Sequence, residues 1–484
     1  MKQTFLITIA ALLSCYGFTQ NRAINWAFGD SAGLNFATEH PTPFLSSIVM
    51  SEPCASISDE EGNLLFYTNG KTIWNAAHEI MLNGNFLDLG AGTLSSTTQA
   101  VIILPDPGDS NKYYIFHHDF NYLKYTIVDM SFEDGSGLVT TKNNIASDIP
   151  FTEKLQAVRH ANGRDWWLMI ETITEVEEGS LIDSINFYSF LISPSGISEP
   201  ILHEGTILTD QETLISLGQM KFNQQGNMLA CTNGRSINLY YFDRCSGYLS
   251  HFYNIDSIFI GNNNDRLYGL EFSNQGNKLY ITKPGEEGKG YLYQYTLDSI
   301  SDIKNTEVII YKNLDTGFQK LYLDQLQLGI DNKIYLTSVG PSYPTFLSVI
   351  NEPNLGGLAC NFDTLTISTG GKIVRLGLPN MPNYNLGVME KSGCDTIGTS
   401  AINTISNYAI QLYPNPAHNY IYLKQAPQGI VQIHVADIYG KEVLYFNQYS
   451  TDVINISTLP SGLYFITITQ ENAMLITQKL VVER

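Results

Sequence analysis

The chain has 484 residues, of which 43% are hydrophobic and only 15% are charged, and its formal net charge at pH 7 is −20. This length exceeds the size at which one hydrophobic core keeps growing, so two or more folded units are expected. Only 27 residues are Lys or Arg, which argues against binding nucleic acid through clustered basic side chains. Tyr (29), Phe (23) and Gly (39) are abundant, and this composition favours strands and turns over helices.

The first twenty residues, MKQTFLITIAALLSCYGFTQ, have the form of a signal peptide. A basic residue, Lys2, precedes an apolar run from Phe5 to Leu13 that is too short to cross a bilayer. We expect cleavage near Gln20 and therefore exclude residues 1–20 from the fold. The alternative is a lipoprotein box at residues 12–15 in which Cys15 is acylated.

Five cysteines remain after residue 20, and no CxxC or Cys/His spacing predicts a zinc site. In an oxidising compartment, Cys231 and Cys245 are candidates to bridge neighbouring strands, and Cys360 and Cys394 to close the end of the main domain. An odd number leaves at least one thiol unpaired or intermolecular. Cys54 is expected to be a small buried hydrophobic residue.

The body of the chain, residues 22–391, contains a recurring unit in which a Gly/Asn/Asp turn leads into an apolar strand, as a hairpin requires. Its clearest copies are DEEGNLLFYT (59–68), NQQGNMLACT (223–232), SNQGNKLYIT (273–282) and GIDNKIYLT (329–337), with looser copies at 109–117 and 161–170. Successive turns are 49 to 63 residues apart.

Four strands in about fifty residues is the arithmetic of a β-propeller blade. Division of the body by this period predicts seven blades, with six or eight as alternatives. We expect residues 25–36 to complete the ring by joining a strand near residues 372–378. An array of immunoglobulin-like sandwiches requires about 100 residues per domain, so the period disfavours it.

Several segments of the body are similar to a family of secreted propeller-like proteins of gliding bacteria of the Bacteroidetes type. They are NWAFGDSAGLNF (25–36), CASISDEEGNLLFYTNGKTIWN (54–75), LSSTTQAVIILPDPG (94–108), LYYFDRCSGYLS (239–250) and GLPNMPNY (377–384). This resemblance implies the propeller fold and an exported protein, but it implies no particular activity.

A polar linker, residues 392–407, precedes a distinct tail at residues 408–484. The tail contains short strands separated by turns, and its length suits a small β-sandwich. It resembles the type A sorting domain of the type IX secretion system, which implies export, recognition by the secretion machinery and often removal of the tail. The matching motif residues are Tyr413, Pro414, Asn415, Pro416, Asp437, Gly440, Lys441, Leu459, Gly462, Tyr464 and Lys479.

The sequence offers few candidates for chemistry. His117, His118 and Asp119 end a predicted strand, where neighbouring side chains point to opposite faces, so a structural pair is favoured over a metal site. The acidic stretches 59–61, 175–178 and 286–287 fit solvated turns better than paired catalytic carboxylates. Residues 262–265 (NNND) offer oxygen ligands for calcium without EF-hand spacing, so no cofactor is expected, with calcium as the alternative.

Two further groups are open to a ligand-binding interpretation. The Ser/Thr-rich stretch 94–99 fits either a plain connector, which we favour, or the lining of a propeller face. Trp74, Trp166 and Trp167 suit sugar stacking or, more simply, blade cores. Asp-Ser/Thr-apolar triplets begin at Asp30, Asp183, Asp256, Asp298, Asp363 and Asp395, and they resemble the O-glycosylation acceptor of the same bacterial group.

The sequence therefore predicts an exported or cell-surface β-propeller that binds or adheres, with a glycan or surface protein as ligand and without catalysis. A surface polysaccharide hydrolase or lyase, and a structural component of a gliding or matrix layer, are the alternatives. An enzyme would require convergent carboxylates or His with shifted pKa values in the central channel, whereas a binding protein would not.

Overall fold

The computed structural model describes residues 21–88, 97–119, 121–175, 183–205, 207–208, 217–234, 236–256, 267–284, 290–298, 300–313, 321–340, 343–395, 411–424, 431–437, 441–449, 453–470 and 473–484. The chain divides into two compact units between residues 397 and 398. The predicted signal peptide lies outside the described residues, so its assignment remains a prediction.

The first unit consists of antiparallel sheets, and seven of them occur in its described residues. Two have three strands each: β1 (Asn25–Phe28), β2 (Asp30–Asn35) and β3 (Thr42–Val49), then β4 (Ala55–Ser58), β5 (Leu64–Thr68) and β6 (Ile73–Asn75). The third sheet contains β7 (Val101–Pro105), β8 (Lys112–His118), β9 (Leu123–Asp129) and β10 (Leu138–Ser147).

The fourth sheet is the largest, with β11 (Leu155–Arg159), β12 (Trp166–Glu175), β13 (Asp183–Ser193), β14 (Gly196–Ile197), β15 (Ile201–His203) and β16 (Ile207–Leu208). The fifth contains β17 (Met220–Phe222), β18 (Met228–Thr232), β19 (Ser236–Phe242) and β20 (Leu249–Asp256). The sixth contains β21 (Leu270–Phe272), β22 (Lys278–Pro284), β23 (Gly290–Thr296) and β24 (Val308–Lys312).

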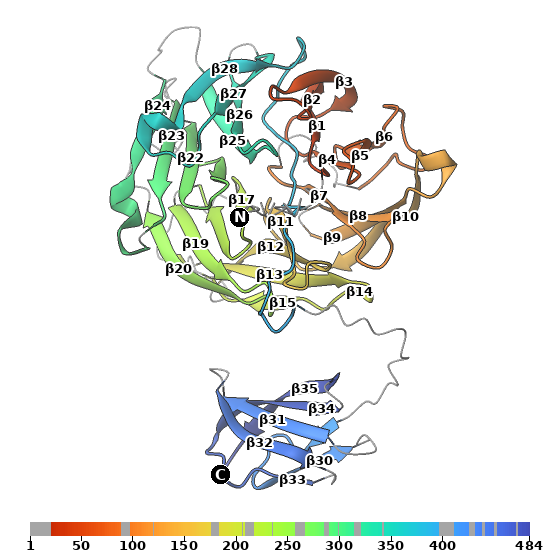
Figure 1. The fold of residues 1–484 in the computed structure, drawn as a ribbon, viewed down its shortest axis with the longest axis vertical. Helices are drawn as coiled ribbons and strands as arrows, with labels where there is room; N and C mark the ends of the chain where they lie inside the picture. Colours follow the sequence, from red (N-terminus) through yellow and green to blue (C-terminus); the bar gives the residue numbers. More distant parts are fainter. Residues whose placement is uncertain are drawn as a thin grey trace, which may run out of the picture. The chain divides into compact units, whose positions relative to one another are not determined.

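The seventh sheet contains β25 (Tyr322–Leu328), β26 (Ile334–Val339), β27 (Phe346–Ile350) and β28 (Phe362–Ser368). Short 3-10 segments occur at Glu133–Gly135, Ile300–Thr306 and Gly357–Cys360. The seven sheets radiate around one axis in chain order, as Figure 1 shows, so the first unit is a seven-bladed β-propeller and the predicted fold is confirmed.

The innermost strands lie next to the axis and are buried on both faces. All four residues of β4 and all five of β11 are buried, which explains why these strands are apolar or contain paired polar residues instead of alternating with solvent-facing ones. Each of the six turns found in the sequence connects the innermost strand of a sheet to the next strand, in sheets two to seven.

The first sheet lacks such a turn and is organised differently. Asn25, at the start of β1, donates to Ser58 at the end of β4 and to the Gly62 oxygen in the turn that follows, so β1 runs opposite to the innermost strand beside it. The chain that follows β28 takes the axial position. It meets the first blade where the Asp30 N–H donates to the Ile373 oxygen and Arg375 pairs with Asp30 at 2.5 Å.

We call residues 369–395 the axial strap. In Figure 1 it runs from the seventh blade through the middle of the ring and on toward the fourth blade. The meeting of residues 25–36 with the segment near residues 372–378 agrees with the sequence-based expectation, although the pairing with the first blade is a single bridge.

The second unit is a β-sandwich, as predicted. One sheet contains β29 (Gln411–Tyr413), β30 (Tyr420–Lys424) and β33 (Val453–Asn455). The other contains β31 (Val431–Asp437), β32 (Glu442–Tyr449), β34 (Gly462–Gln470) and β35 (Ala473–Val482). Alternating side chains such as Ile421, Ile433 and Ile466 are fully buried between the two sheets.

Candidate functional site

A layer of carboxamide side chains closes the axis of the ring. Gln219 accepts hydrogen bonds from the Leu270 and Leu326 N–H groups at 3.1 and 2.9 Å, so it joins three blades. Gln99 spans from the third blade to the fifth, where it accepts from the Met220 N–H and donates to the Met220 oxygen. Because these buried amides use both their donor and their acceptor atoms, they fix the blades without leaving unpaired polar groups.

The axial strap completes this layer. Asn380 donates to the Val101 and Leu155 oxygens, at 3.2 and 2.8 Å, and its own oxygen accepts from the Gln99 and Gln156 amides. Gln325 accepts from Leu378 in the strap and donates to Thr98 in the third blade. This layer of amides lies across the axis. On one side of it the innermost strands begin, and on the other side they end.

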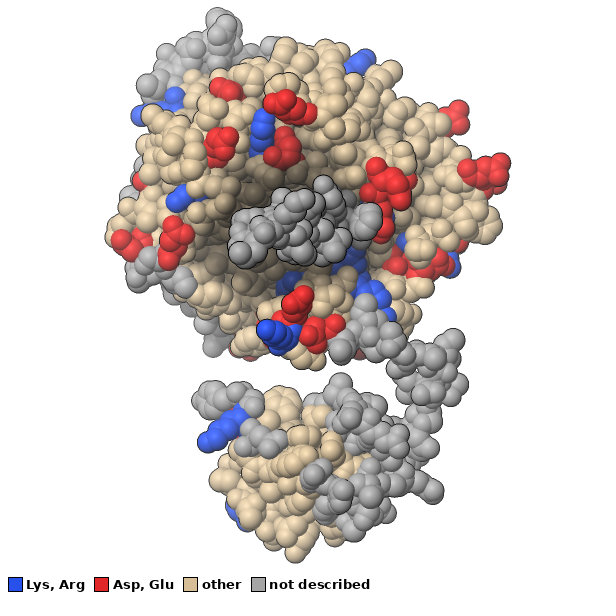
Figure 2. All heavy atoms as spheres, viewed as in Figure 1, with Lys and Arg blue, Asp and Glu red and all other residues tan. Residues whose placement is uncertain are grey.

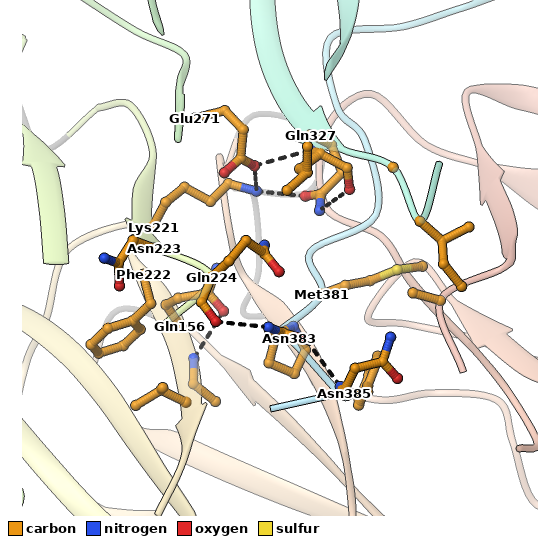
Figure 3. Close-up of a pocket in the computed structure, with 18 of the residues that line it drawn as sticks. Gln156, Lys221, Phe222, Asn223, Gln224, Glu271, Gln327, Met381, Asn383 and Asn385 are labelled. Atoms are coloured by element: carbon orange, nitrogen blue, oxygen red, sulfur yellow. Dashed lines mark hydrogen bonds and ion pairs between the residues drawn. The ribbon is translucent and has the colours of Figure 1, made fainter. Parts of the chain in front are cut away.

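A polar pocket of about 120 Å³ lies at the end of the axis where the innermost strands finish. Figure 3 shows its side chains converging from the fourth to seventh blades and from the strap. Among its lining residues, two are charged and seven carry carboxamides, namely Gln156, Asn223, Gln224, Gln327, Asn332, Asn383 and Asn385.

The two charged residues of the polar pocket neutralise each other. The Lys221 ammonium lies 3.3 Å from the Glu271 carboxylate and donates to the Gln327 oxygen at 2.5 Å. The Leu328 N–H donates to the same carboxylate at 3.1 Å. Burial lowers the pKa of Lys221 and raises that of Glu271, and the attraction between the two groups opposes both shifts.

Several amides of the polar pocket are available to a ligand. The Asn383 side chain is engaged, because it donates to the main-chain oxygen of Gln224 and accepts from the main-chain N–H of Asn385. In contrast, the side chains of Gln224, Asn332 and Asn385 make no hydrogen bond within the described part of the chain. Asn332 and Asn385 are exposed to solvent, so these groups offer both donors and acceptors at the pocket mouth.

In the space-filling view of Figure 2, Asp and Glu side chains and several Lys and Arg side chains lie around the middle of the ring. The whole chain has a formal net charge of −20 at pH 7. An anionic ligand would therefore approach against an unfavourable field, whereas a neutral ligand would not.

His117 and His118 are packed into the third blade. Both are buried, His117 bonds the Asp88 oxygen and Thr126, and His118 packs against Phe151. Burial lowers the pKa of His117 to about 4 and that of His118 to about 3. The two histidine side chains have different neighbours and do not converge on one site, which agrees with the structural interpretation. Asp119 instead pairs with Lys124 at 2.5 Å.

The stretch 59–61 lies in a turn, as expected, whereas Glu175 is the last residue of β12. Asp59 accepts the Asn63 N–H within its turn, and Glu60 is exposed and pairs with Arg22. Residues 176–178, 286–287 and the NNND segment 262–265 lie outside the described residues, so the calcium alternative is not tested there. In the described part of the chain, no three or more His, Cys, Asp or Glu side chains are grouped to hold a metal ion.

The tryptophans belong to blade cores. Trp166 donates to the Pro105 oxygen and lies under the Arg159 guanidinium at 3.9 Å, while Trp167 donates to the Arg244 oxygen. Trp74 stacks on Tyr67 with ring centroids 5.5 Å apart. Trp166 and Trp167 are therefore core residues, whereas Trp74 is half-buried and packs against the core from one side.

The Ser/Thr-rich stretch corrects one expectation. The sequence favours a plain connector, but Thr97, Thr98 and Gln99 are all buried, and Thr98 and Gln99 form hydrogen bonds with groups of other blades. Their position directly before β7 places them at the axis. The sequence contains a signal for these axial positions. A Gln recurs in or just before the innermost strand of four blades, in TTQA (97–100), KLQA (154–157), LGQM (217–220) and LDQL (323–326). This recurrence marks the axial positions, which the turn pattern alone does not.

The predicted disulfide pairings are wrong. Cys245 pairs with Cys394, with Cα atoms 5.7 Å apart, and this bond fastens the axial strap to the fifth blade. Cys231 faces the interior, where its thiol donates to Glu171 at 2.9 Å, and Cys360 is buried in the seventh blade. Cys245 instead lies in the turn after β19, so the strap reaches it and Cys231 does not. Cys54 is free and buried, as expected.

Several motif residues of the tail make contacts within the sandwich, whereas Tyr413, Pro414 and Pro416 are exposed. Asn415 accepts the Val481 N–H at 2.8 Å, which ties the YPNP segment to the last strand. Asp437 accepts the Lys441 N–H in the predicted turn, and the Tyr464 hydroxyl donates to the Pro460 oxygen. Leu459 is buried and Gly462 begins β34. Gly440 and the side chain of Lys479 lie outside the described residues.

Fold and tail together define a class of exported β-propeller protein with a C-terminal sorting unit. Residues 411–483 match the family described as secretion system C-terminal sorting domain. This match indicates export by the type IX secretion system to the cell surface or beyond it. No helix in the described residues is long and apolar enough to cross a membrane.

Comparison with solved structures finds matches that cover about 68–73% of the chain at low sequence identity. A candidate 6-phosphogluconolactonase from Bacteroides uniformis is 11% identical, with a TM-score of 0.41, over 73% of this chain and 98% of that one. A similar candidate from Bacteroides fragilis is 12% identical, with a TM-score of 0.40, over 73% and 96%. Hsv2 of Kluyveromyces lactis is 10% identical, with a TM-score of 0.37, over 68% and 90%. No curated protein has significant sequence similarity to the chain.

Proposed function

We propose that the exported propeller is a binding module and that its ligand occupies the polar pocket at the axis. The observation that carries this proposal is the composition of the lining, in which seven carboxamides surround one mutually neutralised ion pair. Amide side chains recognise groups that both donate and accept hydrogen bonds. Hydroxyl groups do both, so the expected ligand is neutral and rich in hydroxyls, as a saccharide is.

The size of the pocket limits what enters it. Its volume of about 120 Å³ is well below the roughly 300–1,000 Å³ typical of pockets that enclose a drug-sized ligand. Only a terminal unit of a larger molecule fits inside. Phe222 and Tyr384 line the same pocket and supply apolar contact for the faces of a sugar ring. We therefore propose that the protein binds the end of a surface or extracellular glycan.

The proposal is tested by probing a glycan and surface-protein array with residues 22–395, followed by calorimetry on any hit. We expect binding to neutral glycans that Gln224→Ala weakens at least tenfold, since a lost hydrogen bond in a desolvated site costs about 1–3 kcal/mol. Gln225→Ala is the matched control, because Gln225 is in the same turn but does not line the pocket. Binding only to proteins, or equal effects of the two substitutions, would contradict the proposal.

A further inference from the structure

The outer face of the three-stranded sheet in the second unit displays a cluster of tyrosines. Tyr413 of β29 is paired with Tyr422 of β30, and Tyr422 is paired with Val453 of β33, so these side chains form one row across the sheet. Tyr420 is two residues from Tyr422 on the same strand and therefore lies on the same face. We call Tyr413, Tyr420, Tyr422 and Val453 the tyrosine face.

The alternation of side chains along β30 explains why these rings point outward. Ile421 and Leu423 are buried because they pack between the two sheets of the sandwich. Tyr420 and Tyr422 are 48% and 39% exposed, and Tyr413 is 50% exposed. The solvent-facing side of an antiparallel sheet ordinarily carries polar residues, so three aromatic rings on this face call for another explanation than packing.

The tyrosines contribute little to the sandwich itself. The rings of Tyr413 and Tyr422 stack on each other with centroids 5.6 Å apart, and a cross-strand pair of this kind stabilises a sheet only modestly. Within the described residues, the side-chain hydroxyls of Tyr413, Tyr420 and Tyr422 make no hydrogen bond. Exposed ring surface and hydroxyl groups are therefore both available to a partner.

The place of Tyr413 in the sorting motif is a second, independent observation. Asn415 of the YPNP segment accepts the Val481 N–H at 2.8 Å and so fixes this segment against the last strand. Asp437 and Tyr464, two other motif residues, also form hydrogen bonds within the unit. These three residues maintain the fold, whereas the Tyr413 ring is presented on the surface.

The identity of the partner follows from what the second unit is. Residues 411–483 match the sorting-domain family, which indicates that the type IX secretion machinery handles this unit. Selection of a protein by its tail requires contact with a surface of that tail. Tyr is enriched at the centres of protein interfaces, because its ring excludes water while its hydroxyl forms a directed hydrogen bond.

We propose that the tyrosine face is the surface through which the type IX secretion machinery recognises the second unit. The complementary surface of the machinery is apolar and shallow, with hydrogen-bond acceptors placed for the tyrosine hydroxyls. This proposal concerns the second unit only. It does not rest on the ligand of the polar pocket, and a change in the tyrosine face should leave glycan binding by the propeller unaffected.

The four-stranded sheet of the same unit supplies a matched control. Tyr445 of β32 and Phe465 of β34 are both 43% exposed, and neither is among the motif residues of the tail. The Tyr445 ring packs against the His434 ring with centroids 4.5 Å apart. Exposed aromatic area alone thus does not distinguish the two faces, whereas continuity with the YPNP segment does.

The test expresses the full chain in a bacterium that has the type IX system. In the double variant Tyr413→Thr/Tyr422→Thr, Thr suits a solvated strand. The fraction of protein outside the cell, measured by fractionation and immunoblotting, should fall about tenfold or more, as when central interface residues are truncated. The control Tyr445→Thr/Phe465→Thr should change this fraction less than about twofold, as surface substitutions usually do. Equal urea midpoints for the two purified variants would exclude unfolding as the cause.

Photo-crosslinking in living cells keeps the proposal testable if a double variant fails to fold. A photoreactive phenylalanine derivative in place of Tyr420 should form an adduct with a component of the type IX machinery, identified by mass spectrometry, and the same group in place of Tyr445 should not. The proposal is overturned if the Tyr413→Thr/Tyr422→Thr protein is exported like the wild type, or if both double variants lose export equally. Adducts with lipid only, or with the machinery only from position 445, would also overturn it.

Discussion

Gly377 in the axial strap lies directly against the main chain of Glu52. A Cβ atom added at Gly377 would stand 1.8 Å from the Glu52 oxygen, so no larger residue fits without movement of the strap or of the second blade. The close contact between Gly377 and Glu52 therefore couples the path of the strap, which closes the ring, to the position of the Glu52 main chain.

Gly377→Ala should therefore destabilise the propeller. Insertion of one methyl group into a closely packed position costs typically about 1–3 kcal/mol, and the free energy of unfolding from urea titration measures it. Gly387→Ala is the matched control, because it lies in the same strap with no atom within 4 Å of an added Cβ. Equal unfolding midpoints for the two variants would show that the strap is not packed as described.

The Cys245–Cys394 bond should stabilise the ring by fixing the end of the strap. It closes a loop across a sequence separation of 149 residues, and bonds of this kind typically contribute about 2–4 kcal/mol. Cys394→Ser should lower the unfolding free energy by that amount, and Cys245→Ser should have the same effect. Peptide mapping without reductant should recover the two residues in one linked fragment. Recovery of a Cys231–Cys245 fragment would contradict the structure.

The buried histidines should make the propeller sensitive to acid. The pKa values of His117 and His118 are lowered, to about 4 and about 3, so the unfolded chain takes up protons first as the pH falls. Their contribution to stability is thus fully present above pH 6.5 and is lost as the pH falls toward the folded values. A tenfold difference in proton affinity between the folded and unfolded chain corresponds to about 1.4 kcal/mol, so the loss is several kcal/mol.

Urea midpoints measured from pH 7.5 to 4.5 should show this loss, and His118→Asn should reduce its slope. An unchanged slope in a folded His118→Asn protein would mean that this side chain does not titrate on unfolding.

The buried Asp324 carboxyl changes the pH dependence of stability in the opposite direction from the histidines. Because its pKa is raised, its contribution to stability is present at low pH and declines as the pH rises through the folded value.

Passage from the periplasm to the outside of the cell should depend on the second unit. Deletion of residues 408–484 removes the whole sandwich, including the contact between Asn415 and Val481 that closes it. The shortened protein should accumulate in the periplasm, which fractionation and immunoblotting would reveal. If it still appeared outside the cell, the tail would not carry the sorting signal.

Local patterns predicted most of the fold, because hairpin turns depend on a few adjacent residues. The turn at Asp59–Asn63 and its five counterparts were recognisable from Gly, Asn and Asp alone. The disulfide pairing is not predictable from local patterns, because the partner of Cys245 is set by the path of the strap, which brings Cys394 to the fifth blade while Cys360 stays buried in the seventh. The polar pocket is not predictable from local patterns, because its residues come from several blades and share no local motif.

The most direct test of the binding account is calorimetry with the neutral glycan that binds most strongly on the array. The structure predicts that Gln224→Ala and Asn385→Ala each raise Kd at least tenfold, whereas Gln225→Ala changes it less than twofold. A ligand whose affinity is the same for all three variants and for the wild type would not occupy the polar pocket, and the central claim would then be wrong.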